Sequence, residues 1–254
     1  MTAVAGLVLA ASVLIGLMLG LLGGGGSILT VPVLVYLAEV DPKPAIAMSL
    51  VVVGATSAVA LIPHARAGRV RWRTGVLFGT AGMAGAYFGG RAAGHIPGSV
   101  LLIAFAAMML VTAVAMLRTR RDSAAAEPVP GSRLPVVKIL AEGAAVGLAT
   151  GLVGAGGGFL VVPALVLLGG LPMPVAVGTS LLVIAMKSTA GLAGYLHTVT
   201  IDWPLTAAVT AIAVLGSLAG SRLAGRIDPA LLRRAFGWFV VVMGLGVLAR
   251  QMTG

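Results

Sequence analysis

A series of apolar segments covers most of this chain, and their length constrains the fold more than any motif does. Hydrophobic residues make up 59% of the 254 residues, charged residues make up only 9%, and the mean hydropathy is +1.10. A soluble domain of this size needs far more charge to cover its surface. The chain is therefore predicted to be an all-α polytopic membrane protein. The segments lie roughly at 3–22, 28–38, 45–62, 74–92 and 99–117, then at 138–153, 159–169, 175–196, 204–221 and 231–249.

Two of these segments, 28–38 and 159–169, are too short to cross a bilayer core. Spanning takes about 20 helical residues, whereas about 11 residues rise only about 16 Å. Each short segment follows a run of glycines. We therefore expect each half to begin with a Gly-broken helix or a re-entrant hairpin, followed by three spanning helices. Whether the short segments span or re-enter is left open by the sequence.

The second half of the sequence repeats the first at an offset of 131 positions. Residues 20–32 and 151–163 both start with a Gly-rich run and end in Pro. Shared low complexity would not keep Trp, Arg and Ser in register as well. The chain is thus predicted to contain two related repeats, 1–117 and 135–254, joined by a polar linker at 118–134. The offset pairs Ser49 with Ser180, Trp72 with Trp203, Gly89 with Gly220 and Arg91 with Arg222.

Basic residues alternate between equivalent loops of the two halves. Loop 64–73 carries four Arg, but its counterpart 195–204 has no Lys or Arg; loop 90–98 carries one Arg, but 222–234 carries four. Because basic loops stay in the cytoplasm, the halves are predicted to cross the membrane in opposite senses, as inverted-topology repeats do. The protein would then lie in the cell membrane, with its linker in the cytoplasm and both termini outside. A parallel duplication with accidental charge is the alternative. Residues 1–22 lack Lys and Arg, so we expect a retained helix rather than a signal peptide.

The two glycine runs interrupt apolar segments at equivalent places. Four adjacent glycines disfavour a helix by roughly 1 kcal/mol each against Ala, and non-helical backbone in lipid survives only inside protein or beside a cavity. The start of the following helix offers free N–H groups and a positive dipole end, which suit an anion. A tight helix crossing or a sharp turn is the alternative. The substrate-binding residues predicted here are Gly24, Gly25, Gly26, Ser27, Gly156, Gly157 and Gly158.

Lys187 lies about a dozen residues inside the apolar segment 175–196. A lysine at the bilayer centre costs about 2.5–3.5 kcal/mol on insertion scales, so it usually faces a cavity or a partner. No Asp or Glu lies at a similar depth in the sequence. The predicted counter-charge is therefore the transported anion. The alternatives are that the side chain snorkels to the interface or is held neutral by burial.

Hydroxyl side chains accompany Lys187 along the same segment. Ser180 is seven residues away and so shares a helix face with it. The repeat partners of these two residues, Ser49 and Thr56, share the equivalent face of the first half. Oriented hydroxyls can bind the oxygens of an oxyanion, although helix–helix hydrogen bonding is as good an explanation for any single one. The set is completed by the neighbours Ser57, Thr179 and Ser188.

Several functional classes lack their signatures. The absence of Cys excludes a disulfide framework and a Cys nucleophile. The three His are spread over segment ends without a metal spacing; we interpret them as interfacial residues, with proton coupling by one of them as the alternative. No Walker motif, catalytic dyad or zinc motif is present. We expect no cofactor, no enzymatic activity and no nucleic-acid partner; a coupling proton or ion and a homo-oligomer are left open.

The sequence resembles the sulfite exporter TauE/SafE family over nearly its whole length. The resemblance lies in the paired Gly-rich motifs that end in Pro, in Val-Gly-Thr-Ser-Leu at 177–181 and in Gly-Ser-Arg-Leu-Ala-Gly-Arg at 220–226. It implies transport of sulfite, sulfoacetate or related organosulfur anions. Together with the residues above, it predicts a secondary transporter, in the export direction, that works by alternating access with a midplane site at the repeat interface. An intramembrane enzyme and a non-transporting scaffold or receptor subunit are the competing classes.

Overall fold

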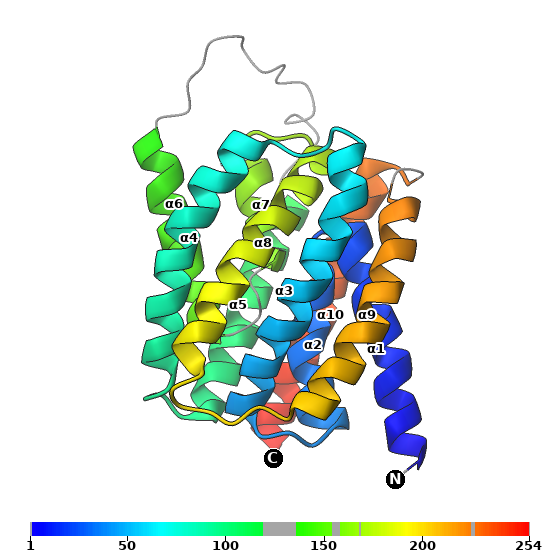
Figure 1. Cartoon of the computed structure of the whole chain (residues 1–254), viewed down its shortest axis with the longest axis vertical. Coiled ribbons are helices and arrows are strands. Elements are labelled where there is room, and N and C mark those ends of the chain that lie inside the picture. Colours follow the sequence, from blue (N-terminus) through cyan, green and yellow to red (C-terminus); the bar gives the residue numbers. More distant parts are fainter. Residues whose placement is uncertain (1, 119–135, 154–157, 168, 225–226, 254) are drawn as a thin grey trace.

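The computed structural model describes residues 2–118, 136–153, 158–167, 169–224 and 227–253, and these form an all-helical bundle without strands (Figure 1). The predicted fold class is confirmed. The first half contains α1 (Thr2–Leu22), α2 (Gly25–Pro32), the π-helix η1 (Val33–Leu37), α3 (Pro42–Arg66), α4 (Trp72–Ala93) and α5 (Gly98–Arg118). The second contains α6 (Val136–Val153), α7 (Gly158–Leu167), α8 (Met173–Tyr195), α9 (Trp203–Leu223) and α10 (Pro229–Thr253).

By length and composition, four helices in the described part can cross a membrane: α3, α6, α8 and α9. Shorter apolar stretches lie within α1, α5 and α10 and across α2 and η1. The large hydrophobic side chains on the outside of the bundle, such as Phe88, Val111 and Leu215, suit a lipid surrounding. The chain is thus a multi-pass membrane protein. The linker predicted at 118–134 lies almost wholly outside the described residues, and the division into two repeats stays a prediction.

The packing of the helices follows the sequence repeat. Helix α1 packs along α9, and its repeat counterpart α6 packs along α4, which is the counterpart of α9. The remaining counterparts pack on one another: α3 on α8, α5 on α10 and α2 on α7. The long contacts are made by small residues, because a Cβ added at Gly20 would meet Ser217 of α9 and one added at Gly89 would meet Leu148 of α6.

The direction of the helices differs between the halves. Figure 1 shows the N- and C-termini at one end of the bundle, whereas α6 begins at the other end. Helix α1 therefore runs along the long axis in the opposite direction to α6. The inverted relation of the two repeats to a membrane remains a prediction and is taken up under the proposed function.

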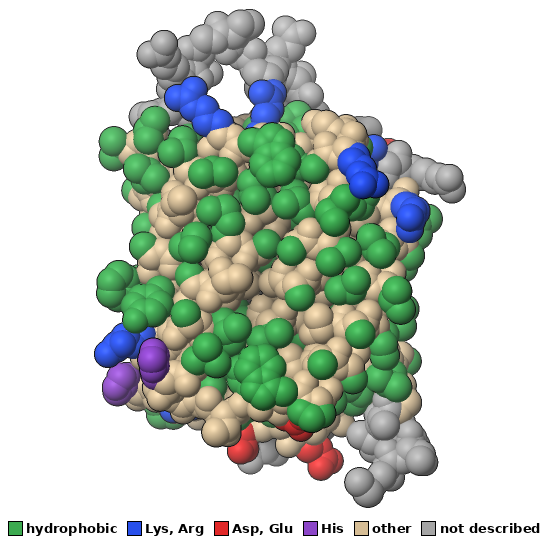
Figure 2. All heavy atoms as spheres, in the orientation of Figure 1, with side chains coloured by type: hydrophobic (Ala, Val, Ile, Leu, Met, Phe, Trp, Pro, Cys, Tyr) green, Lys and Arg blue, Asp and Glu red, His purple; other side chains and the backbone are tan. Residues whose placement is uncertain are grey.

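Charged side chains separate towards the two ends (Figure 2). The connection between α3 and α4 carries Arg66, Arg69, Arg71 and Arg73 at one end, whereas Glu39, Asp41 and Asp202 lie near the start of α3 and of α9 at the other. Basic side chains also occur at the acidic end, where Figure 2 shows blue (Lys or Arg) and purple (His) side chains side by side. The middle of the visible face is apolar. The bundle thus has a basic end and an acidic end.

Helix α2 folds back on α1 after a break at Gly23, as a re-entrant hairpin does. Gly23 has φ +68°, a conformation that glycine adopts without steric cost. A Cβ at Gly26 would meet the carbonyl of Ile15 and lie 2.7 Å from Cβ of Leu19, so α2 returns beside α1. Pro32 lies at the junction of α2 and η1, where the helix widens into a π turn.

The α1–α2 hairpin touches α7 where α2 and α7 begin. A Cβ at Gly24 would meet the backbone carbonyl of Gly158, and a Cβ at Gly158 would lie 2.6 Å from Cα of Gly24. Two helix N-termini therefore converge inside the bundle, backbone against backbone. We call this contact the glycine crossing.

We expect Gly24→Ala to destabilise the protein strongly, because the methyl group has no space beside the Gly158 carbonyl and the starts of α2 and α7 must separate to admit it. The measurement is the thermal unfolding midpoint of the detergent-solubilised protein. Gly246→Ala in α10 is the matched control, since a Cβ there meets nothing within 4 Å. Equal midpoints for the two variants would show that the crossing is looser than described.

Candidate functional site

Helices α3 and α8 cross in the interior at repeat-equivalent positions. A Cβ at Gly54 would lie 3.1 Å from Cβ of Ser188, and one at Gly191 would lie 3.5 Å from a methyl carbon of Leu50. Contacts that rise along one helix and fall along the other show that the two helices are antiparallel here. Thr56 and Lys187, which the repeat offset pairs, therefore both lie close to this crossing.

Lys187 is buried in this region, with 2% of its surface exposed. Its Nζ donates a hydrogen bond to Oγ1 of Thr150 on α6, over 3.0 Å. Among the described residues it forms no ion pair with an acidic side chain. The side chain therefore does not snorkel to the interface. Its amino group lies inside the bundle, and its described partner is a neutral hydroxyl.

Three of the predicted hydroxyl residues are buried without a hydrogen-bond partner in the described part of the chain: Thr56, Ser57 and Ser188. Buried polar groups are paired in the great majority of cases, and an unpaired one lowers stability. Ser188 follows Lys187 in the sequence, Thr56 is the repeat equivalent of Lys187, and Ser57 follows Thr56. Their hydroxyls are not used by hydrogen bonds within the described part of the chain.

The other predicted hydroxyls bond to backbone. Ser27, Ser49 and Ser180 donate to carbonyls three residues earlier, and Ser180 also lies 3.5 Å from the carbonyl oxygen of Gly23. Oγ1 of Thr179 accepts the N–H of Arg71, which holds the connection between α3 and α4. In this structure, Thr179 thus stabilises a loop at the basic end instead of facing the α3–α8 crossing.

The glycine residues divide in the same way. Gly24 and Gly158 form the glycine crossing, where Cδ1 of Ile184 lies 2.8 Å from a Cβ built at Gly158. Because Ile184 is one turn before Lys187 on α8, the crossing and the buried cation share a helix. Gly26 packs on α1, and Gly25 is the first residue of α2. Gly156 and Gly157 lie outside the described residues.

His64 differs from the sequence-based interpretation as an interfacial loop residue. It lies in the last turn of α3, is 2% exposed, and its Nε2 lies 3.3 Å from the carbonyl oxygen of Gly20 on α1. Its repeat equivalent Tyr195 donates from its hydroxyl to the carbonyl of Leu152 on α6, over 2.7 Å. Each repeat thus ties its third helix to the end of its first. Sequence comparison missed this pair because the two residue types differ.

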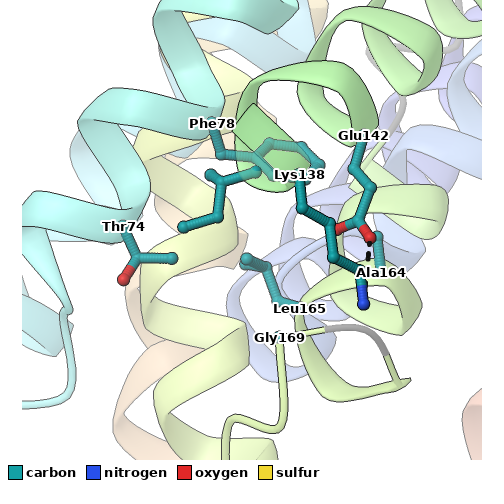
Figure 3. A pocket seen from close by; sticks show the side chains of 8 residues that line it. Thr74, Phe78, Lys138, Glu142, Ala164, Leu165 and Gly169 are labelled. Atoms are coloured by element: carbon teal, nitrogen blue, oxygen red, sulfur yellow. Dashed lines mark ion pairs between the residues drawn. The ribbon is translucent and has the colours of Figure 1, made fainter. Parts of the chain in front are cut away.

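Three surface pockets contain none of the residues predicted to bind substrate. One lies among α4, α6 and α7, where Lys138 and Glu142 form an ion pair over 3.8 Å (Figure 3). Another opens at the acidic end between the start of α3 and the α8–α9 connection, beside Lys43 and His197. The third lies beside His64 and Arg69. The candidate site instead rests on the buried Lys187 and the three buried hydroxyls without a described partner.

The fold is that of a multi-pass membrane protein with a buried lysine in its interior. The family model described as sulfite exporter TauE/SafE matches residues 8–247, and the chain belongs to this family. A probable membrane transporter protein of Xylella fastidiosa (strain 9a5c) is 36% identical over 94% of this chain and 92% of its own length. Another, YdhB of Bacillus subtilis (strain 168), is 25% identical over 92% and 96%. No solved structure matches the chain.

Proposed function

We propose that this chain is a secondary transporter that exports small anions through the cell membrane by alternating access. The single observation that carries the proposal is the buried amino group of Lys187, which contacts a neutral hydroxyl and no described acidic side chain. A charge inside the membrane region is costly, and an anion that enters the site removes that cost. An anion should therefore bind next to Lys187 in the interior.

The surroundings of Lys187 suit an oxyanion. Thr56, Ser57 and Ser188 supply unpaired hydroxyls, and the starts of α2 and α7 converge at the glycine crossing one helical turn along α8. Helix N-termini favour negative charge through their free N–H groups and dipoles. The sulfur chemistry of the substrate, namely sulfite, sulfoacetate or a related organosulfur anion, rests on the family description.

Alternating access is supported by the pairing of equivalent helices across the interior. Helices α3 and α8, and likewise the starts of α2 and α7, meet their own counterparts, so exchanging the conformations of the repeats opens the site to the other side. The driving force is a gradient of the anion or of a coupled proton or ion, because the chain contains no nucleotide-binding motif. Neither an intramembrane enzyme nor a passive scaffold would need this pairing of equivalent helices.

The direct test is flux of the purified chain in proteoliposomes. We expect saturable efflux of sulfite or sulfoacetate that exceeds the flux of lactate, measured with and without a pH gradient to reveal proton coupling. An enzyme would consume the anion without moving it, and a scaffold would do neither. Flux no faster than that of empty liposomes for every sulfur anion would refute the proposal.

Lys187→Met is expected to weaken binding of sulfite at least about tenfold, because it keeps the length of the side chain and removes a charge-assisted contact that contributes about 1.5–3 kcal/mol. The loss should be larger for dianions than for monoanions, and Lys187→Arg should keep part of the affinity. Calorimetry on purified variants measures this. Lys138→Met is the control, since Lys138 is exposed and pairs with Glu142. Wild-type affinity in Lys187→Met would make the lysine structural.

The orientation of the bundle follows from its charge. We propose that the basic end, with the connection between α3 and α4, faces the cytoplasm. The termini, which lie at the opposite end in Figure 1, are then outside. Single-cysteine labelling with an impermeant reagent on intact cells tests this, because the natural chain has no Cys. We expect labelling at residues 2 and 253 and none at residue 68; the reverse pattern would contradict this orientation.

A further inference from the structure

Thr150 was not among the residues that the sequence singled out, yet it makes the hydrogen bond to the buried cation. It is 1% exposed and lies in the last turn of α6. Its Oγ1 accepts Nζ of Lys187 over 3.0 Å and donates its own proton to the carbonyl of Gly147 over 3.2 Å. Because the hydroxyl proton is engaged by the backbone, the side presented to Lys187 is a fixed acceptor.

An acceptor in this position orients the ammonium without competing for an anion. An ammonium has three N–H donors and no acceptor, so one donor bound to Thr150 leaves two for a ligand. The hydroxyl of Thr150 itself has no proton left to donate to an anion. Its effect on substrate must therefore pass through Lys187.

The repeat equivalent of Thr150 carries no hydroxyl. It is Leu19, which is completely buried, and the equivalent of Lys187 is Thr56. The half without a lysine at this position thus has an apolar side chain where the other half has Thr150. The hydroxyl occurs in the half that carries the cation.

We propose that Thr150 is a positioning residue of the anion site, which fixes the Lys187 ammonium against α6 so that two N–H donors are left for the substrate. This inference rests on the proposed anion-binding function of Lys187. It adds that the charge of the anion is recognised by the second repeat alone, through a lysine held by the helix that leads into the glycine crossing.

We expect Thr150→Val to weaken sulfite binding at least about fivefold, since the ammonium loses the acceptor that orients it, whereas Thr150→Ser stays within about twofold of wild type. Calorimetry with sulfite on the purified full-length protein measures both. Thr112→Val is the matched control: Thr112 is 3% exposed, bonds to the carbonyl of Met108 in its own helix, and lies on α5. Its sulfite affinity should equal that of wild type.

A double-mutant cycle separates positioning from a general structural effect. In a Lys187→Met background, Thr150→Val should cause no further loss of affinity. An equal loss in both backgrounds, a Thr150→Val protein with wild-type affinity, or a Thr150→Ser protein as weak as Thr150→Val would each overturn the inference. If Thr150→Val does not fold, Thr150→Ala against Thr150→Ser applies the same criteria, because these two differ only by the hydroxyl.

Failure of the proposed function looks different in the same experiment. If Lys187→Met binds sulfite as wild type does, the anion site is refuted and the role of Thr150 falls with it. If Lys187→Met loses affinity while Thr150→Val does not, the anion site stands and only the positioning role is refuted.

Discussion

The bundle depends on backbone-to-backbone contact at the glycine crossing. Lipid offers no hydrogen bonds, so a break in a helix must be enclosed by protein, and the break after α1 is covered by the start of α7. Gly24 and Gly158 approach so closely that neither position has room for a side chain. The starts of α2 and α7 therefore fix each other, and through Ile184 and Ser180 they also fix α8, the helix that carries Lys187.

The second constraint is the buried Lys187, which forms no ion pair with an acidic side chain among the described residues. A buried carboxylate beside Lys187 would neutralise an ammonium charge there permanently, in an ion pair. The structure offers it the oxygen of Thr150 instead, which satisfies one donor and neutralises nothing. The nearby hydroxyls of Thr56, Ser57 and Ser188 are likewise left unpaired. Only a bound ligand can pair the remaining polar groups of this site, and a bound ligand, unlike a carboxylate of the chain, can leave again.

The sequence was sufficient for whatever follows from length, spacing and repetition. It predicted the membrane class, the break after the first glycine run and the absence of a buried acidic partner for Lys187 among the described residues, because apolar length and the position of charges do not depend on tertiary contacts. It could not predict contacts between distant helices. Thr150 accepts a hydrogen bond from the side chain of Lys187, whereas Thr179 accepts one from the backbone of Arg71, and nothing in their sequence surroundings distinguishes the two. Burial of His64 depends on the carbonyl of Gly20, which only the folded hairpin brings near.

Lys187 and Thr56 occupy equivalent positions in the two halves of the sequence, and their difference has a consequence for the symmetry of the chain. Both residues lie close to the crossing of α3 and α8, where each repeat meets its own copy. A lysine at both positions would place two basic groups in an interior that screens charge poorly, and two protonated lysines there would repel each other. With lysine in the second half and threonine in the first, the halves differ at the place where a charge costs most, although their helices pack alike.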